Sequence, residues 1–207
     1  MPHQKKRFFM PLLGPAMFAV VALSGGFAHA ADPGQVVEEF HDTLLKVMKT
    51  AEKTPVRKRY EQLEPAIVKA FNLSFMIRVA VGPRWKKTSD ADKETLAEAF
   101  KRMSVGTYAS RFDGYSGQSF KTLEIKDGPR NSKLVKTHIA SPGDKPVKLI
   151  YVMRQFGADW NIVDVLLDGS ISEMAVRVSE YRNVLRSHGA GALARALNRK
   201  ADRLVNE

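Results

Sequence analysis

The sequence contains no cysteine, which excludes disulfide bonds, thiolate catalysis and cysteine-based metal sites. Packing alone must therefore stabilise the fold. Histidine is scarce as well, with five in 207 residues. His41, His138 and His188, the three beyond residue 30, lie far apart along the chain and lack the spacing of a metal ligand set. The sequence therefore predicts neither a metal site nor a bound cofactor.

Long hydrophobic runs are also missing, except at the N-terminus. There, basic residues 5–7 precede an apolar stretch over 8–23, and Ala28-His29-Ala30 follows as an A-x-A cleavage site. This order predicts a cleavable secretory signal peptide over residues 1–30, cut after Ala30. An uncleaved membrane anchor is the alternative, but two prolines and a glycine interrupt the stretch, and an anchor needs about 20 consecutive apolar residues.

Cleavage at this site leaves residues 31–207, the length of one ordinary domain. The net charge falls from +11 to +8, because three basic residues leave with the signal peptide. A positively charged protein attracts anionic partners such as phospholipid headgroups or acidic protein surfaces. No nucleic acid partner is expected, since the sequence has no basic motif interleaved with aromatic residues.

The first half of the predicted domain has the 3.6-residue apolar period of helices. Helices are predicted over 33–48, 54–71, 72–82 and 88–108. Asn72 is the expected N-cap of the third helix, and Ser89 with Asp92 is the expected capping pair of the fourth.

The pattern then changes to the two-residue period of strands and returns to helices near the C-terminus. Strands are predicted over 119–126, 133–140, 147–154 and 160–167, and helices over 171–187 and after Gly191. This order indicates an α+β fold, in which helices cover a curved antiparallel sheet of about four to five strands. Such an arrangement encloses a concave volume suited to an apolar pocket.

Catalytic constellations are hard to find. The segment Gly114-Tyr115-Ser116-Gly117 lacks the spacing of a nucleophile elbow and is interpreted as a turn that ends a helix. Asp164 and Asp168 share one face of a predicted strand, as paired carboxylates for acid–base chemistry would. Asp168-Gly169 has the composition of a turn, however, and Asp164 is expected to cap or hydrogen-bond nearby backbone. An enzyme that uses Asp164 inside an apolar pocket is kept as an alternative.

Large aromatic and flexible apolar side chains are plentiful in both halves of the domain. Nine of them would converge if the helices cover the sheet: Phe71, Phe75, Met76, Phe100, Met103, Tyr108, Tyr151, Met153 and Trp160. Periodicity does not distinguish a filled core from a ligand-holding hollow, and the pattern alone favours the filled core.

Three groups of residues form motifs in a fixed order. Phe71-Asn72 is followed by Met76, Val79, Gly82 and Trp85. Residues 150–153, 160–165 and 168–172 are similar to Y-x-M, W-K-x-x-D-V and G-x-S runs, and Tyr181-Arg182 precedes Leu185. Together these segments resemble the motifs of the MlaC family of periplasmic proteins, also called the toluene-tolerance family.

The sequence departs from the family pattern at three places. Asn72 replaces the usual aspartate, and Asn161 replaces the usual basic residue after tryptophan. Residues 172–179 form an insertion before Tyr181-Arg182, and this segment resembles the hopanoid-associated HpnM branch of the family. Details of how family members dock their partners are therefore not transferred to this chain.

The resemblance implies a periplasmic lipid carrier and not an enzyme. The acyl chains of a phospholipid or hopanoid-like lipid would occupy a deep apolar pocket while the headgroup faces water. The carrier would shuttle the lipid between lipid transport complexes of the inner and outer membranes. The residues predicted to line the pocket are Phe71, Phe75, Met76, Val79, Trp85, Phe100, Met103, Tyr108, Leu149, Tyr151, Met153, Trp160, Ile162 and Leu166. A periplasmic adaptor with a filled core, docking an acidic partner, is a further alternative.

Overall fold

The computed structural model describes residues 32–206, so the predicted signal peptide over 1–30 lies outside the described residues. The α-helices are α1 (Pro33–Met48), α2 (Val56–Ala70), α3 (Leu73–Val81), α4 (Asp90–Arg111), α5 (Glu173–Ser187) and α6 (Gly189–Asn206). Short 3-10 helices are η1 (Ala51–Lys53), η2 (Gly82–Lys87) and η3 (Pro129–Asn131). Within residues 32–206, no helix combines the length and apolar character that a membrane span requires.

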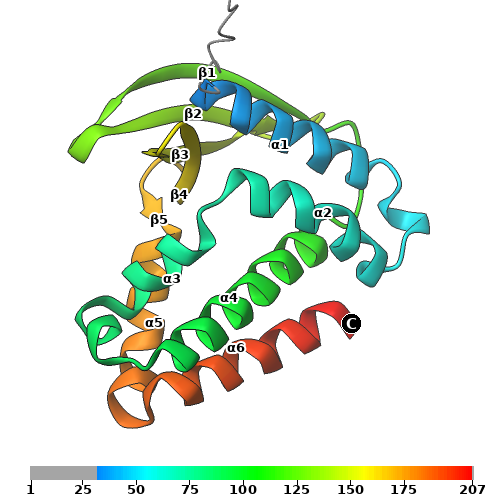
Figure 1. The fold of residues 1–207 in the computed structure, drawn as a ribbon. Coiled ribbons are helices and arrows are strands. Elements are labelled where there is room, and N and C mark those ends of the chain that lie inside the picture. Colours follow the sequence, from blue (N-terminus) through cyan, green and yellow to red (C-terminus); the bar gives the residue numbers. More distant parts are fainter. Residues whose placement is uncertain (1–31, 207) are drawn as a thin grey trace, which may run out of the picture.

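The strands form one antiparallel sheet in chain order, from β1 to β5. They are β1 (Ser119–Gly128), β2 (Ser132–Ala140), β3 (Val147–Phe156), β4 (Asp159–Leu167) and the short β5 (Ile171–Ser172). Because every neighbour in the sheet is also a neighbour in sequence, the meander needs only hairpin connections. The predicted α+β class and curved antiparallel sheet are confirmed (Figure 1).

Side-chain caps fix where the helices begin. The Asn72 carboxamide oxygen accepts a hydrogen bond from the Phe75 amide at 2.9 Å, and the Ser89 hydroxyl oxygen accepts one from the Asp92 amide at 3.1 Å. The Ser89 hydroxyl also donates to the Asp92 carboxylate at 2.9 Å. Both predicted capping sites are therefore confirmed, and each satisfies a backbone donor that a helix leaves free in its first turn.

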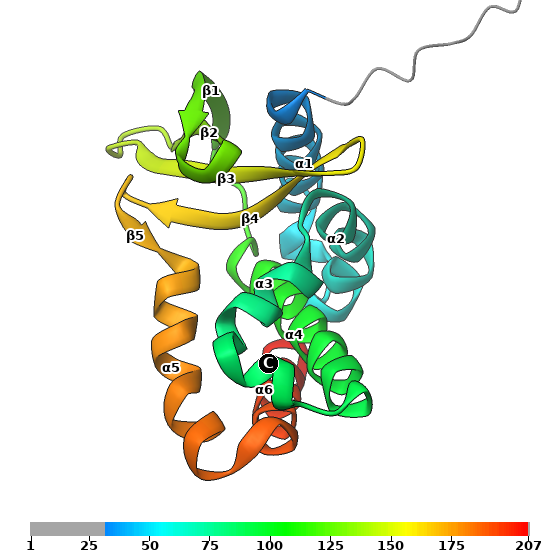
Figure 2. The same cartoon turned by 60° about the vertical axis from the view of Figure 1, so that its left-hand side comes forward.

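The sheet lies at one end of the molecule and the helices extend away from it (Figure 1). Helix α1 packs against β1, β2 and β4, whereas α5 leaves the sheet and leads to α6, which packs along α4. In Figure 2, α3 and α4 lie between α5 on one side and α2 on the other. Residues 172–179, the segment predicted to be an insertion, supply the N-cap and the first turns of α5.

The contact between α4 and α6 is filled by small and medium side chains. Leu193, Ala194, Leu197 and Ala201 of α6 are buried. Gly106 of α4 faces α6 closely, since a Cβ there would lie 3.4 Å from side-chain atoms of both Leu204 and Val205. Arg102 closes the outer side of the contact by donating to Asn198 and, at 2.8 Å, to Asp202.

Strand β1 forms an edge of the sheet and carries a β-bulge. The pairing of β1 with β2 shifts register between Thr122 and Glu124, which leaves Leu123 as the extra residue. Leu123 and Ile125 are among the most exposed large apolar residues, while Lys121, Glu124 and Lys126 add charge to the same strand.

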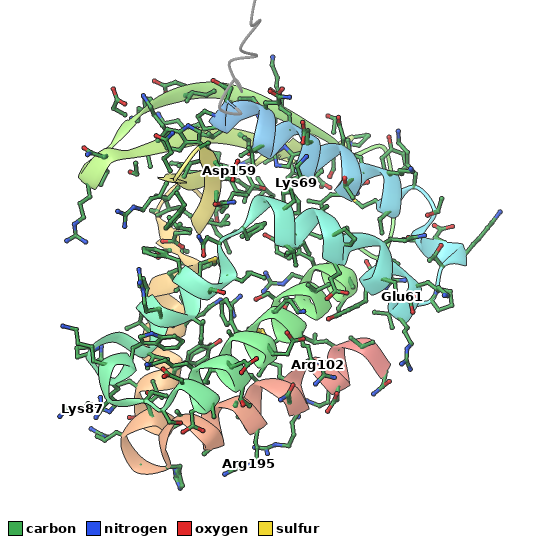
Figure 3. All side chains as sticks on the ribbon, in the orientation of Figure 1. Glu61, Lys69, Lys87, Arg102, Asp159 and Arg195 are labelled. Carbon is green, nitrogen blue, oxygen red and sulfur yellow. The ribbon has the colours of Figure 1, made fainter. Side chains whose placement is uncertain are left out.

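The outer surface carries many charged side chains, and Figure 3 shows Lys87 and Arg195 at the end of the molecule opposite the sheet. Arg84, Lys86 and Lys87 of η2 are all exposed. Ion pairs such as Lys69–Glu39, at 2.7 Å, lie in solvent and contribute little to stability.

Candidate functional site

An apolar pocket lies between the concave face of the sheet and the helices. Its volume is about 170 Å³. The sheet contributes Ile139, Val147, Leu149, Tyr151, Val165 and Leu167. The helices and the segment that follows α4 contribute Ile67, Phe71, Leu73, Met76, Tyr108 and Phe112. The polar lining consists of Ser104, Thr107, Arg111, Glu173 and Arg177.

A larger hollow of about 860 Å³ lies elsewhere on the surface, near α3 and α4. It is open to solvent, and its walls include polar residues such as Asn72, Glu94, Thr95 and Asn198. An apolar ligand gains free energy by leaving water, so a wet open hollow does not retain it. The smaller, less open and more apolar pocket is therefore the candidate site.

Aromatic rings form one wall of the pocket and continue into the core behind it. The Phe40 ring meets Phe71 edge-on, with centroids 5.2 Å apart, and meets Tyr108 edge-on at 5.4 Å. Phe112 stacks on Tyr108 with ring centroids 5.7 Å apart. Edge-to-face and offset contacts of this kind are favourable beyond the area they bury, so they stabilise this wall.

His41 and Tyr151 form a buried polar contact behind the aromatic wall. The His41 Nε2 atom lies 2.9 Å from the Tyr151 hydroxyl, and the imidazole stacks on Phe120 with centroids 4.2 Å apart. Burial lowers the pKa of His41 to about 3, and it raises the pKa of the Tyr151 hydroxyl well above its usual range. Both side chains are therefore neutral at physiological pH, and the contact holds α1 to β3.

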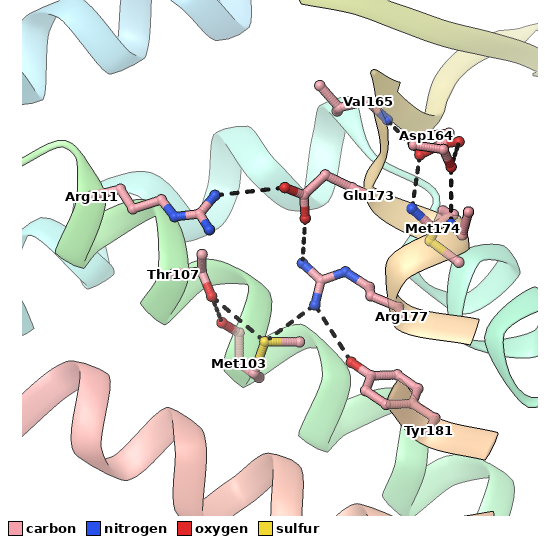
Figure 4. Close-up of polar contacts among 11 residues, drawn as sticks. Met103, Thr107, Arg111, Asp164, Val165, Glu173, Met174, Arg177 and Tyr181 are labelled. Atoms are coloured by element: carbon pink, nitrogen blue, oxygen red, sulfur yellow. Dashed lines mark hydrogen bonds and ion pairs between the residues drawn. The ribbon is translucent and has the colours of Figure 1, made fainter. Parts of the chain in front are cut away.

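Charged residues gather where α4 and α5 meet the pocket, as Figure 4 shows. One Glu173 carboxylate oxygen lies 3.6 Å from Arg177 Nη2, and the other lies 3.8 Å from Arg111 Nη1. Arg177 also approaches the Tyr181 hydroxyl at 3.4 Å. Two arginines and one glutamate leave this part of the pocket with an excess positive charge.

Asp164 accepts three hydrogen bonds at the start of helix α5, beside the Ser172 N-cap. Its carboxylate accepts hydrogen bonds from the Val165 amide at 2.8 Å, the Met174 amide at 3.0 Å and the Ser172 hydroxyl (Figure 4). The expectation that Asp164 bonds nearby backbone is confirmed, and this geometry leaves it poorly placed as a base. Among residues 32–206, no three metal-ligating side chains gather closely enough to hold an ion.

The structure brings only some of the predicted pocket residues to the pocket. Phe71, Met76, Tyr108, Leu149 and Tyr151 line it. Phe100, Met103, Met153 and Ile162 are buried in the surrounding core. Phe75, Val79, Trp85, Trp160 and Leu166 lie outside the lining, and 42% of Val79 is exposed. Contact of any of the fourteen with a ligand stays a prediction.

Sequence reasoning missed most of the polar lining and several apolar residues. Val147 was detectable, because it shares the strand face of Leu149 and Tyr151. Val165 and Leu167 pair with Tyr151 and Leu149 across β3 and β4, and a correct register would have identified them. Arg177 and Glu173 carried no signal, since charged residues on a helix normally face solvent.

The chain was compared with known proteins. The family model described as MlaC protein matches residues 38–199. A solved phospholipid-binding protein from Ralstonia solanacearum, in complex with a phospholipid at 1.53 Å resolution, has the same fold with a TM-score of 0.73. The two sequences are 18% identical over 84% of this chain and 99% of that one. The search of curated proteins gave no match. Because the family model covers well over half of the sequence, the chain belongs to the MlaC family.

Proposed function

We propose that this protein is a periplasmic lipid carrier, which binds the acyl chains of a phospholipid or hopanoid-like lipid and moves the lipid between the inner and outer membranes. The observation that carries the proposal is the apolar pocket between the sheet and the helices, with its aromatic wall. Membership of the MlaC family and the phospholipid held by the Ralstonia protein of the same fold support it.

The size of the pocket bears on how a lipid would enter. Its volume of about 170 Å³ is close to that of a cavity that holds benzene, and below the roughly 300–1,000 Å³ of ordinary ligand sites. An acyl chain therefore requires the sheet and the helices to separate. Leu73 and Met76, which line the pocket from the short helix α3, are the simplest wall to displace.

The free energy of moving acyl chains out of water is compatible with a carrier that both takes up and releases a lipid. Two acyl chains hold roughly 30 methylenes, and removing them from water is worth about 24 kcal/mol. Free diffusion of such a lipid through water is therefore negligible. A bilayer provides nearly the same gain, so transfer between membrane and pocket is close to balanced.

The compartment follows from the N-terminal sequence. The predicted signal peptide, residues 1–30 with cleavage after Ala30, would deliver the domain to the periplasm. Lipid transport complexes of the two membranes are the expected partners, and the exposed basic residues of η2 suit an anionic surface. Binding, not catalysis, is the proposed role. The hydrogen bonds that Asp164 accepts argue against an enzyme that uses it as a base. The pocket between the sheet and the helices argues against an adaptor with a filled core.

Native mass spectrometry of protein purified from the periplasm tests the proposal. We expect an adduct with the mass of a phospholipid or a hopanoid, and a lower melting temperature after delipidation, because a ligand bound to the native state stabilises it. A protein whose mass and melting temperature do not change on delipidation would contradict the carrier function.

A further inference from the structure

Arg177 lies in the pocket wall with unusually weak polar contacts for a buried cation. Its side chain is 14% exposed, and its Nε atom is buried with no hydrogen-bond partner among the described residues. Its polar neighbours are the Tyr181 hydroxyl at 3.4 Å, the Met103 sulfur at 3.5 Å and the Glu173 carboxylate at 3.6 Å. All three distances exceed the usual length of a charge-assisted hydrogen bond. The guanidinium therefore has donor capacity that the fold does not use.

A second polar group in the same wall is also unpaired. Ser104 is 6% exposed, lines the pocket, and its hydroxyl has no partner among residues 32–206. Ser104 lies one helical turn after Phe100 on the same face of α4, and Arg177 contacts Phe100 and Met103 of that helix. The guanidinium lies over the Phe100 ring, 5.4 Å from its centroid. Two residues with unsatisfied buried donors therefore line one pocket, Ser104 from α4 and Arg177 from α5.

The charge balance around these donors indicates the kind of ligand they would bind. Arg177 and Arg111 share a single carboxylate, that of Glu173, at 3.6 and 3.8 Å. The group has a net charge of +1, and an anion with two or three oxygens would pair with the arginine fork more closely than Glu173 does. Buried polar groups are normally satisfied, so two orphan donors beside an excess positive charge indicate an anionic ligand.

We infer that Arg177 and Ser104 bind the anionic group, a phosphate or a carboxylate, of the lipid whose chains fill the apolar part of the pocket. This inference rests on the proposed carrier function and adds a ligand class to it. Glu173 lies between Arg177 and Arg111, at 3.6 and 3.8 Å, so its carboxylate competes with the anionic group of the lipid for Arg177. The protein therefore favours anionic lipids over neutral ones with the same chain.

The test uses three soluble ligands with one chain: dodecyl phosphate, dodecanoate and dodecanol, titrated by calorimetry. We expect the two anions to bind the wild-type protein ~10- to 100-fold more tightly than dodecanol, the range for hydrogen bonds to charged groups. In Arg177→Met this preference disappears and dodecanol affinity is retained. The matched control is Arg182→Met, on the exposed side of the same helix, which keeps the preference.

A second variant keeps the test decisive if Arg177→Met folds poorly. Glu173→Gln removes the competing carboxylate, so dodecyl phosphate should bind several-fold more tightly than to wild type. A merely structural role for the Arg177–Glu173 pair predicts no such gain.

The outcomes separate this inference from the carrier function. Equal affinity for all three ligands, or a preference that persists in Arg177→Met, overturns the anion site and leaves the carrier standing. Displacement of dodecyl phosphate by inorganic phosphate at similar concentrations shows a site for free anions and also overturns the inference. If no ligand binds and the periplasmic protein carries no lipid, the carrier function itself fails.

Discussion

Two contact regions of this molecule differ sharply in how they are filled. Where α4 meets α6, small residues let the helices approach closely, and leucine and alanine side chains fill the space between them. Where the helices face the sheet, large aromatic and branched side chains surround a volume of about 170 Å³ that they do not fill. Bulky rings pack against one another in the second region, whereas leucine and alanine side chains fill the first. Side-chain size and shape, more than hydrophobicity, separate a core from a pocket.

The largest expected effect comes from breaking the filled region. Leu193→Ala removes a side chain that is 2% exposed between α6 and its neighbours, and we expect a loss of roughly 2–5 kcal/mol in the free energy of unfolding. Urea denaturation measures it. Lipid affinity should not change, since Leu193 does not line the pocket. A loss of affinity in the folded variant would show that the two regions are coupled.

The buried His41–Tyr151 contact behind the aromatic wall of the pocket should make stability depend on pH. The pKa of His41 is about 3 in the fold and near 6.5 in the unfolded chain, so the unfolded state binds more protons between these values. Stability is therefore full above pH 6.5 and falls as the pH drops, by about 2 kcal/mol at about pH 5. His41→Gln removes the titrating group and should flatten this part of the stability profile, whereas the control His138→Gln should not. An unchanged slope in His41→Gln would contradict the assignment.

Asp164 of β4 supports the start of α5, where its carboxylate accepts hydrogen bonds from the Met174 amide and the Ser172 hydroxyl. Asp164→Asn removes the negative charge at the helix N-terminus and one acceptor, and should cost about 1 kcal/mol of folding free energy. Asp159→Asn, at an exposed position on the same strand, is the matched control. Thermal melts compare the two variants. Equal melting temperatures would show that the cap contributes nothing.

The smallest expected effect on stability comes from filling the apolar pocket between the sheet and the helices. Leu149→Trp extends a pocket-lining side chain into the free volume, so the free energy of unfolding should change by less than about 1 kcal/mol. Lipid occupancy in native mass spectra should nevertheless be lost. Val79→Trp, on the exposed side of α3, should keep its lipid. Unfolding of Leu149→Trp would mark this position as core and remove the distinction between the two regions.

Local structure was largely predictable from the sequence because it depends on neighbouring residues. The Asn72 cap, the Ser89–Asp92 pair and the strand alternation at Leu149, Tyr151 and Met153 are local signals, and the structure contains all of them. Their physical causes act over a few residues.

The pocket was harder to predict, because it depends on register and on volume. Leu166 was expected in the lining, but Val165 and Leu167 point there instead, since the pairing of β3 with β4 shifts register between Val152 and Met153. The buried position of Arg177 depends on how α5 meets α4, and no local pattern encodes that approach. Assignment of the inserted segment to the HpnM branch stays a prediction.

The bulge at Leu123 also affects how the edge strand β1 can interact with other protein chains. An edge strand presents unpaired backbone groups to any other extended chain, and a protein that must open its core to load a lipid exposes apolar surface while doing so. The bulge interrupts a regular ladder, and Lys121, Glu124 and Lys126 put charge along it. A second copy of this protein therefore cannot add a regular strand to β1 easily, because the edge is bent and charged. Self-association through this edge is disfavoured while the pocket is open.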